Sequence, residues 1–423
     1  MAESVRDDHF LPVRRADLVR RLLADPLVPV AERAGIAQVC AALGDLLHLE
    51  TRRRAERLKE LYAPLDPNRD TSGVAAAAAP VDQDRPPGDH HDTGADFSGA
   101  LGGLLERANY RRISDEELER AYRTESVFRV RLHTRLDDFA ELVLHRRGLR
   151  RRQERVPRWF GLRSRPLDVD YFERVVMHVR FQDADHFDAK RRAKLAFKPG
   201  TTVLKLFENI PVADLEMIFP NSEVRMRLSD QLVLGVPALL GGFTILANLG
   251  TTLLFVAGML LAWLGVRNQT ATVTHAELVA LGASLFTLAI FVTRQLSRLR
   301  FRRLQFFKML ADSLYYRNLD NNAGVLHHLL DTAEEEEIKE AVLAYVFLRS
   351  GGACREGDLD ATIESWFATA LGLTVDFEVD DAVAKLERLG VASQQDGIWT
   401  ALAPDAAFSA LRTQWSGGLA AAE

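Results

Sequence analysis

The chain of 423 residues lacks the features that would place it in a familiar class at once. Its two cysteines, Cys40 and Cys354, lie far apart and have no Cys or His at ligand spacing, which argues against a disulfide framework and a zinc finger. The N-terminal residues contain no apolar core of a signal peptide. No phosphate-binding loop, dinucleotide fingerprint, nucleophile elbow or zinc-protease motif occurs, so the sequence indicates no familiar catalytic site and no cofactor.

A second absence concerns charge. Residues 231–266 contain no charged residue and no histidine. This stretch of 36 residues exceeds the ~20 apolar residues that a helix needs to cross a bilayer. A polar break follows, and a second apolar run extends from Leu278 to Val292. The two runs predict a transmembrane helical hairpin over 231–292. Small residues at four-residue spacing predict helix packing and a homo-oligomer; they are Ala238/Gly242, Gly258/Ala262 and Ala276/Ala280/Ser284.

Acidic residues are also absent from the stretch that follows the second apolar run. Its basic residues include Arg294, Arg298, Arg300, Arg302 and Arg303. By the positive-inside rule these arginines predict that both termini are cytoplasmic. We expect a bacterial inner (cytoplasmic) membrane, with the mitochondrial inner membrane as the alternative. Neither Pro nor Gly occurs between Ala283 and Gly324, so the second helix is expected to continue to about Tyr316.

The sequence pattern predicts an α+β membrane protein built from six segments. We expect N-terminal helices over 1–65, a disordered linker over 66–100, a cytoplasmic α+β domain over 101–230, the hairpin over 231–292, a basic helical extension and turn over 293–330, and an acidic winged-helix-like domain over 331–423.

The α+β domain is expected to contain a small antiparallel sheet. Apolar residues alternate with polar ones in four stretches, at 127–132, 139–144, 172–181 and 202–207. Ser114 and Glu117 form a capping-box pattern for a short helix to about Arg123. The arginine-rich segment 146–165 is predicted to be a long, exposed, basic loop.

The last ~90 residues are expected to form three helices and a hairpin, the order of a winged helix. The helices are expected at 334–348, 360–371 and 380–389, and Asp396-Gly397 predicts the hairpin turn. The run of four glutamates at 334–337 is interpreted as a solvated helix start. Residues 331–423 contain 18 acidic against 6 basic residues, a net charge of about −12. A phosphate backbone would be repelled, so we expect no nucleic acid and a possible protein partner instead.

Five stretches together resemble one family. They are HFLPVRRADL at 9–18, LKELYAPLDP at 58–67, ANYRRIS at 108–114, VLKLFENIPVADLEMIFP at 203–220 and YYRNLDNNAGVLHHLLDTAEEEEIKEAVLAY at 315–345. They are similar to the transmembrane protein 143 family, a family of unknown function found in bacteria and eukaryotic organelles. The resemblance implies a membrane hairpin with its bulk on the cytoplasmic or matrix side, and it implies no activity, catalytic residue or cofactor.

The motif residues have a structural and a functional interpretation. Asn209, Pro211, Asp214 and Glu216 are interpreted as part of a junction helix. Asp214 and Glu216 could also act as a carboxylate pair, although residues two apart on a helix do not face each other. Asn318, Asp320, Asn321 and Asn322 are interpreted as a turn and helix cap, with ligand binding as the alternative.

A compact acidic cluster is the weak candidate for a metal site. It consists of Asp183, Asp185, His186 and Asp188. Calcium loops use alternating carboxylates of this kind, but the glycine and distal glutamate of such a loop are missing. A solvated turn between strands is the favoured interpretation, and no metal is expected.

These observations favour a membrane-anchored interaction or scaffolding protein. Its expected partners are the lipid bilayer, further copies of the chain and a protein that contacts the acidic C-terminal domain. The first alternative is an enzyme with a site in the α+β domain near Asp214 and Glu216. A transporter or channel component is the weaker alternative, because the apolar runs lack the ionisable groups that such proteins usually carry.

Overall fold

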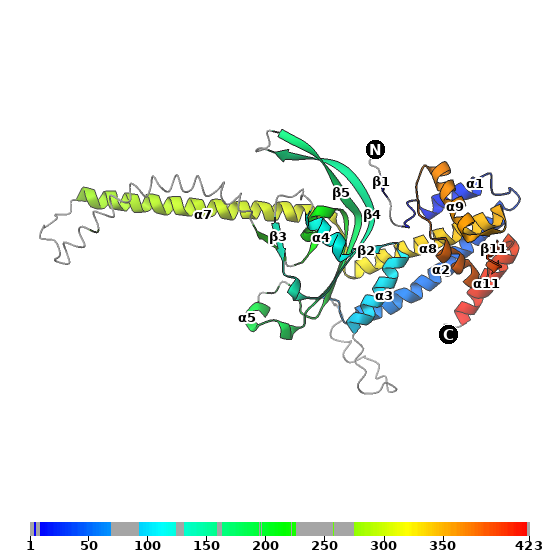
Figure 1. Ribbon diagram of the computed structural model, residues 1–423. Coiled ribbons are helices and arrows are strands. Elements are labelled where there is room, and N and C mark those ends of the chain that lie inside the picture. The colour runs from blue at the N-terminus through cyan, green and yellow to red at the C-terminus, as the bar shows by residue number, and fades with distance from the viewer. Residues whose placement is uncertain are drawn as a thin grey trace, which may run out of the picture. The chain divides into compact units, whose positions relative to one another are not determined.

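A computed structural model of the chain describes residues 4–5, 9–68, 93–123, 131–158, 163–193, 195, 197–220, 222–225, 257 and 275–420 (Figure 1). The chain divides into two compact units. The first unit comprises residues 1–127, 136–215 and 317–423, and the second comprises 128–135 and 216–316.

The first unit contains an antiparallel sheet with the strand order β1-β4-β5-β6-β8, in which β2 also pairs with β4. The strands are β1 (Ser4–Val5), β2 (Arg111–Arg112), β4 (Phe139–Arg158), β5 (Arg163–Phe181), β6 (Thr202–Pro211) and β8 (Asn318–Asn321). Alternation predicted the central strands at 139–144, 172–181 and 202–207, and all three are confirmed. The fourth predicted strand, at 127–132, lies mostly outside the described residues.

The basic loop predicted at 146–165 is wrong, because β4 and β5 pair through this region (Figure 1). Arginines that looked like a solvated run face acidic residues on the neighbouring strand. Arg151 Nε lies 2.7 Å from Asp170 Oδ1, and an Arg150 guanidinium nitrogen lies 2.5 Å from Glu173 Oε1. Arg151 lies directly opposite Asp170 in the register, and opposite charges across a strand pair stabilise the ladder. These acidic partners follow the arginines by about 20 residues, so the local composition concealed the hairpin.

Three N-terminal helices belong to the same unit: α1 (Arg15–Ala24), α2 (Arg33–Tyr62) and α3 (Thr93–Arg107). Helix α3 begins inside the predicted linker 66–100, because Phe97 is fully buried and orders it. Residues 69–92 of that linker lie outside the described residues. Tyr62 and Phe97 pack with Val176 and Leu204 of the sheet. One sheet face is thus covered by α2, α3 and the start of α8 (Ala323–Gly351).

The predicted capping box is confirmed at α4 (Asp115–Arg123). The Glu117 backbone N–H donates to Ser114 Oγ, and the Ser114 N–H donates to a Glu117 carboxylate oxygen, each at 3.2 Å. Two backbone donors at the helix start are satisfied reciprocally.

The C-terminal elements follow the expected helix and hairpin order. They are α8 (Ala323–Gly351), β9 (Cys354–Arg355), α9 (Glu356–Trp366), a π-helical turn (Phe367–Leu371), α10 (Val379–Arg388), β10 (Ala392–Gln395), β11 (Ile398–Ala401) and α11 (Pro404–Ala420). The three strands form a small sheet in the order β10-β11-β9. Asp396 and Gly397 have φ angles of 51° and 77°, as a type I′ turn requires, so the predicted turn is confirmed.

The N-terminal and C-terminal helices share one hydrophobic core. Leu18 of α1 and Leu43 of α2 pack in the same cluster as Tyr345 of α8, Leu386 of α10 and Leu411 of α11. Figure 1 shows α2, α8 and α11 side by side. The domain boundary drawn at residue 331 therefore falls inside α8, and the C-terminal helices bury their apolar faces against the N-terminal ones.

In its described residues, the second unit contains a short strand pair and a long helix. Strand β3 (Arg131–Thr134) pairs with β7 (Ser222–Arg225), and α7 extends from His275 to Arg317. The expected continuous helix to about Tyr316 is confirmed.

The predicted transmembrane hairpin over 231–292 is contradicted. Among the described residues, no helix has both the length and the apolar character to cross a membrane. Residues 231–256 and 258–274 lie outside the description, and the second run forms the first part of α7. That run, Leu278 to Val292, covers about 22 Å at ~1.5 Å per residue, short of the ~30 Å hydrocarbon layer. An apolar run this short is equally compatible with a helix that packs on protein.

Candidate functional site

In the acidic run of α8, Glu334 and Glu335 are half-buried and Glu336 and Glu337 are buried, so its interpretation as a solvated helix start is wrong. The helix begins at Ala323, and the glutamates therefore lie about three turns inside it. Glu336, Glu337, Lys339 and Glu340 expose only 1–3% of their surface. Buried charges of this kind persist only where they are paired and hydrogen-bonded. Their partners come from five other parts of the first unit.

Glu336 and Lys339 bind the backbone of the N-terminal segment. The Leu11 N–H donates to Glu336 Oε2 at 3.0 Å, and Lys339 Nζ donates to the Leu11 and Val13 carbonyl oxygens at 2.6 and 3.2 Å. Lys339 Nζ also lies 2.6 Å from Glu336 Oε1, one helical turn away. Burial raises the pKa of Glu336, and the Lys339 ammonium opposes that rise. Two side chains of α8 thus hold the N-terminal segment by its peptide groups.

Glu340 joins α8 to α10 and to the segment after α3. Lys385 Nζ lies 2.7 Å from Glu340 Oε2 and 2.6 Å from Asp381 Oδ2. Asn109 Nδ2 donates to Glu340 Oε1 at 3.3 Å and to the His9 carbonyl oxygen at 3.1 Å. Burial raises the pKa of Glu340 to about 7, although Lys385 acts against this rise. For Lys385, burial lowers the pKa, but the carboxylates of Glu340 and Asp381 outweigh it and the net shift is upward.

Glu337 and Glu334 connect the same helix to α2 and α3. Arg54 donates to both oxygens of Glu337, at 3.1 and 3.0 Å, and Arg107 Nε lies 3.3 Å from the same carboxylate. His48 Nδ1 lies 3.0 Å from each oxygen of Glu334. The acidic charge of α8 is therefore neutralised largely within the chain, by basic groups of the N-terminal helices and of α8 and α10.

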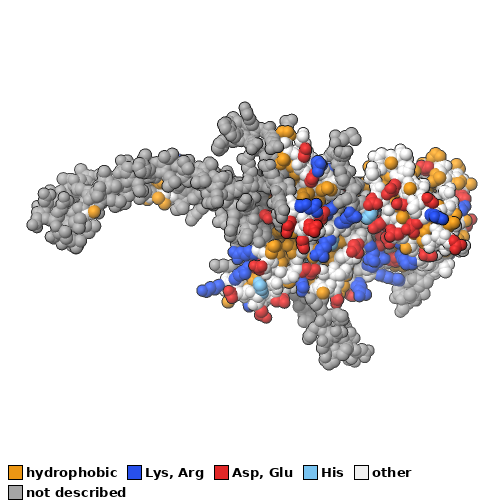
Figure 2. Space-filling view, in the orientation of Figure 1, with side chains coloured by type: hydrophobic (Ala, Val, Ile, Leu, Met, Phe, Trp, Pro, Cys, Tyr) orange, Lys and Arg blue, Asp and Glu red, His pale blue; other side chains and the backbone are white. Residues whose placement is uncertain are grey.

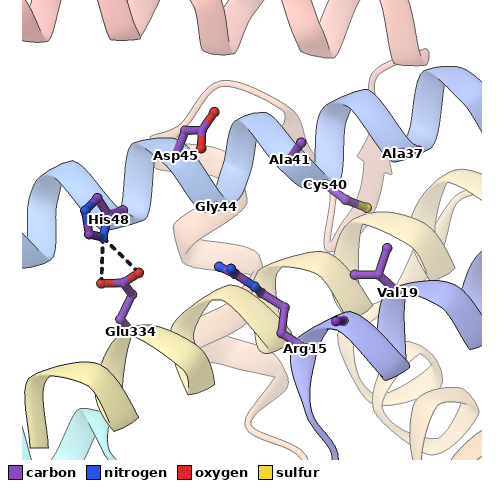
Figure 3. A pocket seen from close by; sticks show the side chains of 10 residues that line it. Arg15, Val19, Ala37, Cys40, Ala41, Gly44, Asp45, His48 and Glu334 are labelled. Carbon is purple, nitrogen blue, oxygen red and sulfur yellow. Dashed lines mark hydrogen bonds and ion pairs between the residues drawn. The ribbon is translucent and has the colours of Figure 1, made fainter. Parts of the chain in front are cut away.

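A groove of about 560 Å³ lies beside this network (Figure 3). It is bounded by α2, by the start of α1 and by Glu334, the first residue of the acidic run of α8. Its lining residues are Arg15, Ala16 and Val19 of α1, Ala37, Cys40, Ala41, Gly44, Asp45 and His48 of α2, and Glu334 of α8. A smaller cavity of about 320 Å³ is lined by the N-terminal segment together with Arg147 and Lys339. Burial raises the pKa of the Cys40 thiol to about 12, which disfavours the thiolate form that acts as a nucleophile.

The motif at 209–216 lies outside both cavities. Pro211 is the last residue of β6, paired with Tyr171, and residues Val212–Ile218 form a 3-10 segment in place of the expected α-helix. Asp214 is buried in that segment with non-helical backbone angles. Asn209 has a φ angle of 50°, and its carbonyl oxygen accepts a hydrogen bond from Arg317. Glu216 follows in the second unit.

The motif at 318–322 is a sheet edge and only partly a cap. Asn318, Asp320 and Asn321 belong to β8, which pairs with β6. Asn322 occupies the position before α8, but its side-chain oxygen accepts from the Leu204 N–H at 3.2 Å and makes no cap hydrogen bond. The Asn322 side-chain oxygen thus accepts a hydrogen bond from β6, 118 residues away, and not from the first turn of α8. The expectation of a capping side chain is therefore wrong.

The remaining predicted residues lie on a turn after β5 and on α7. Asp183, Asp185, His186 and Asp188 lie around a short 3-10 turn (Ala184–His186) after β5 and before α5 (Ala189–Arg192). Within the described part of the chain, no group of three or more His, Cys, Asp or Glu is placed to hold a metal ion. Arg294 is exposed on α7, while the side chains of Arg298, Arg300, Arg302 and Arg303 fall outside the description.

The α8 network was missed because charge was taken as a sign of exposure. A usable signal was present, since residues 338–348 (IKEAVLAYVFL) are apolar on nearly every side of the helix. A helix that is apolar all round is buried, and charged residues next to it at three- and four-residue spacing must then find buried partners.

Comparison with known proteins adds a family of unknown function. A family model described as a protein of unknown function (DUF3754) matches residues 172–324, about a third of the chain. The match extends from β5 to the first residues of α8 and does not include the acidic run. No solved structure matches the chain. The resemblance to the transmembrane protein 143 family remains a prediction.

Proposed function

We propose that this chain is an interaction or scaffolding protein whose C-terminal helices contact a basic surface of another protein. The outward face of α10 is the observation that carries this proposal. Asp380, Asp381 and Glu387 are exposed, whereas Lys385, the helix's one lysine, is buried against Glu340. In a winged helix that binds DNA, the corresponding recognition helix presents cations to the phosphates.

Acidic residues of neighbouring segments extend this face. Asp360 and Glu364 come from α9, and Asp376 lies between α9 and α10. Burial raises the pKa of Asp360, and the neighbouring carboxylates of Glu364, Asp376 and Asp380 raise it further, so these groups lie within one electrostatic neighbourhood. Figure 2 shows acidic side chains gathered on the helical part of the first unit. Such a field attracts a basic partner and repels nucleic acid.

The shared core gives this face a firm base. Helices α9 and α10 pack on α8, which the N-terminal helices hold through both apolar contacts and buried ion pairs. A binding surface on packed elements is positioned more firmly than one on loops, which suits a scaffolding role.

Charge reversal in the full chain tests the proposal. The variant Asp358→Lys/Asp380→Lys/Glu387→Lys changes three exposed acids of α9 and α10, and Glu56→Lys/Glu60→Lys/Glu106→Lys makes the same charge change on α2 and α3. Affinity purification with mass spectrometry should recover a stoichiometric protein with the wild type and the control but not with the first variant. Equal recovery by both variants would contradict the proposal, as would retention of the wild type on a duplex DNA column at about 50 mM salt.

The homo-oligomer expected from the sequence is a separate proposal. Helix packing in lipid does not support it, because no helix among the described residues is long and apolar enough to cross a membrane. The native mass of the purified chain by light scattering tests it directly, and a mass equal to one chain would refute it.

A further inference from the structure

The groove between α1 and α2 contains the exposed side chain of Arg15, whose guanidinium has no partner among the described residues. The Arg15 backbone N–H donates to Glu335 at 3.1 Å, which fixes the start of α1 on α8. The Arg15 guanidinium itself forms no hydrogen bond or ion pair with any residue of the described chain. Figure 3 shows this side chain extending across the groove toward α2. A guanidinium presents planar, paired donors that match the geometry of a carboxylate or phosphate.

Small residues of α2 leave room beside this guanidinium. A Cβ at Gly44 would lie 3.5 Å from an Arg15 guanidinium nitrogen, an ordinary van der Waals distance, so the guanidinium lies against this part of α2. From Gly44 the groove continues over Cys40 and Ala37, with Val19 opposite. Seven residues of helix amount to about 10 Å at ~1.5 Å per residue. This part of the lining is apolar, and it adjoins the cation.

The other charged groups of the lining are already paired or directed elsewhere. His48 closes one end of the groove by its contact with Glu334, which occupies both carboxylate oxygens. Asp45 is directed away from Arg15 on the other side of the α2 ribbon (Figure 3). Arg15 is thus the charged group with free hydrogen-bonding capacity inside the groove.

We propose that this groove binds a small organic anion, with its carboxylate on Arg15 and an apolar body along Val19, Ala37 and Cys40. The volume of about 560 Å³ lies in the ~300–1,000 Å³ range of small-molecule sites. This inference is independent of the protein-interaction role proposed above, because the groove is formed by α1, α2 and α8 and the acidic face by α9 and α10.

Titration calorimetry of the full chain tests the inference with sodium octanoate as the probe and sodium acetate as the anion without an apolar body. Octanoate should bind with one site per chain, and acetate at least about tenfold more weakly, because each buried CH₂ contributes ~0.8 kcal/mol and 1.4 kcal/mol is a factor of ten. Equal binding of both anions, or no binding of octanoate at about 10 mM, would overturn the proposal.

Three variants locate the site. Arg15→Gln should weaken octanoate binding at least about tenfold, since it removes a charge-assisted contact. Arg20→Gln on the same helix is the matched control, because Arg20 is exposed and lies 3.2 Å from Asp17; it should bind as the wild type does. Ala37→Leu keeps the cation but fills the groove, and it should also lose binding. Unchanged binding by Arg15→Gln or by Ala37→Leu would place the anion elsewhere and refute the site, while an unchanged unfolding midpoint shows that each variant is folded.

Discussion

The α8 network gives a stability prediction from the comparison of a buried ion pair with an exposed one. Lys339 and Glu336 form an ion pair at three-residue spacing with side chains 2% and 1% exposed. Lys59 and Glu56 form a pair of the same residue types and spacing on α2, but with side chains 43% and 64% exposed. Replacement of each lysine by methionine retains most of the apolar stem. The two variants therefore differ mainly in the burial of the carboxylate that loses its ammonium partner, which is Glu336 in one and Glu56 in the other.

Lys339→Met should destabilise the protein by about 3–5 kcal/mol, because it leaves a buried carboxylate without its cation. It also removes the donor to the Leu11 and Val13 carbonyl oxygens. Lys59→Met should cost at most about 1 kcal/mol, the range for exposed pairs. Glu336 can take up a proton when Lys339 is absent, so the cost should decrease as the pH falls below neutral.

Urea unfolding of the full chain gives the comparison, provided that the slope of the first transition is the same in both variants. Limited trypsin digestion adds a local measurement, since Arg14 and Arg15 follow directly on the held segment. Cleavage there should accelerate in Lys339→Met and not in Lys59→Met. Stabilities within 1 kcal/mol of each other, together with equal cleavage rates, would show that the buried network does not hold the N-terminal segment.

Three further predictions concern pH, the second ion pair and the glycines. Burial lowers the pKa of His145 from 6.5 to about 4, so the unfolded chain binds more protons than the folded chain between these pH values. Stability should therefore fall by about 3 kcal/mol as the pH falls from about 6.5 to 4. The variant His145→Phe should flatten the curve of unfolding midpoint against pH. At pH 7, Glu340→Gln should destabilise less than Lys385→Met, because the amide still accepts from Lys385 while the second variant leaves Glu340 without its lysine; equal urea midpoints would argue against this. Gly397→Ala should cost about 1–2 kcal/mol because φ is 77° there, whereas Gly351→Ala, at a helical position with open space around it, should be neutral or stabilising in the same thermal scans.

Local chemistry in the sequence determined the elements that need only neighbouring residues. Ser114 and Glu117 complete a capping box within one turn, and Asp396-Gly397 supplies the two positive φ angles of a hairpin. The helical stripe without Pro or Gly predicted α7 to within one residue of its C-terminal end. Alternation predicted the central strands, because a strand with one buried face carries that pattern whatever lies against it.

Tertiary structure decided everything that depends on a partner distant in the chain. The glutamates of α8 look like solvated charges until Leu11, 325 residues from Glu336, and Lys385, 45 residues from Glu340, are placed beside them. The arginines at 150–151 look like a loop until β5 brings acids opposite, and Asn322 looks like a cap until β6 offers the Leu204 N–H. A charge or amide carries the same local signal whether water or a buried partner satisfies it, and only the fold determines which of the two is present.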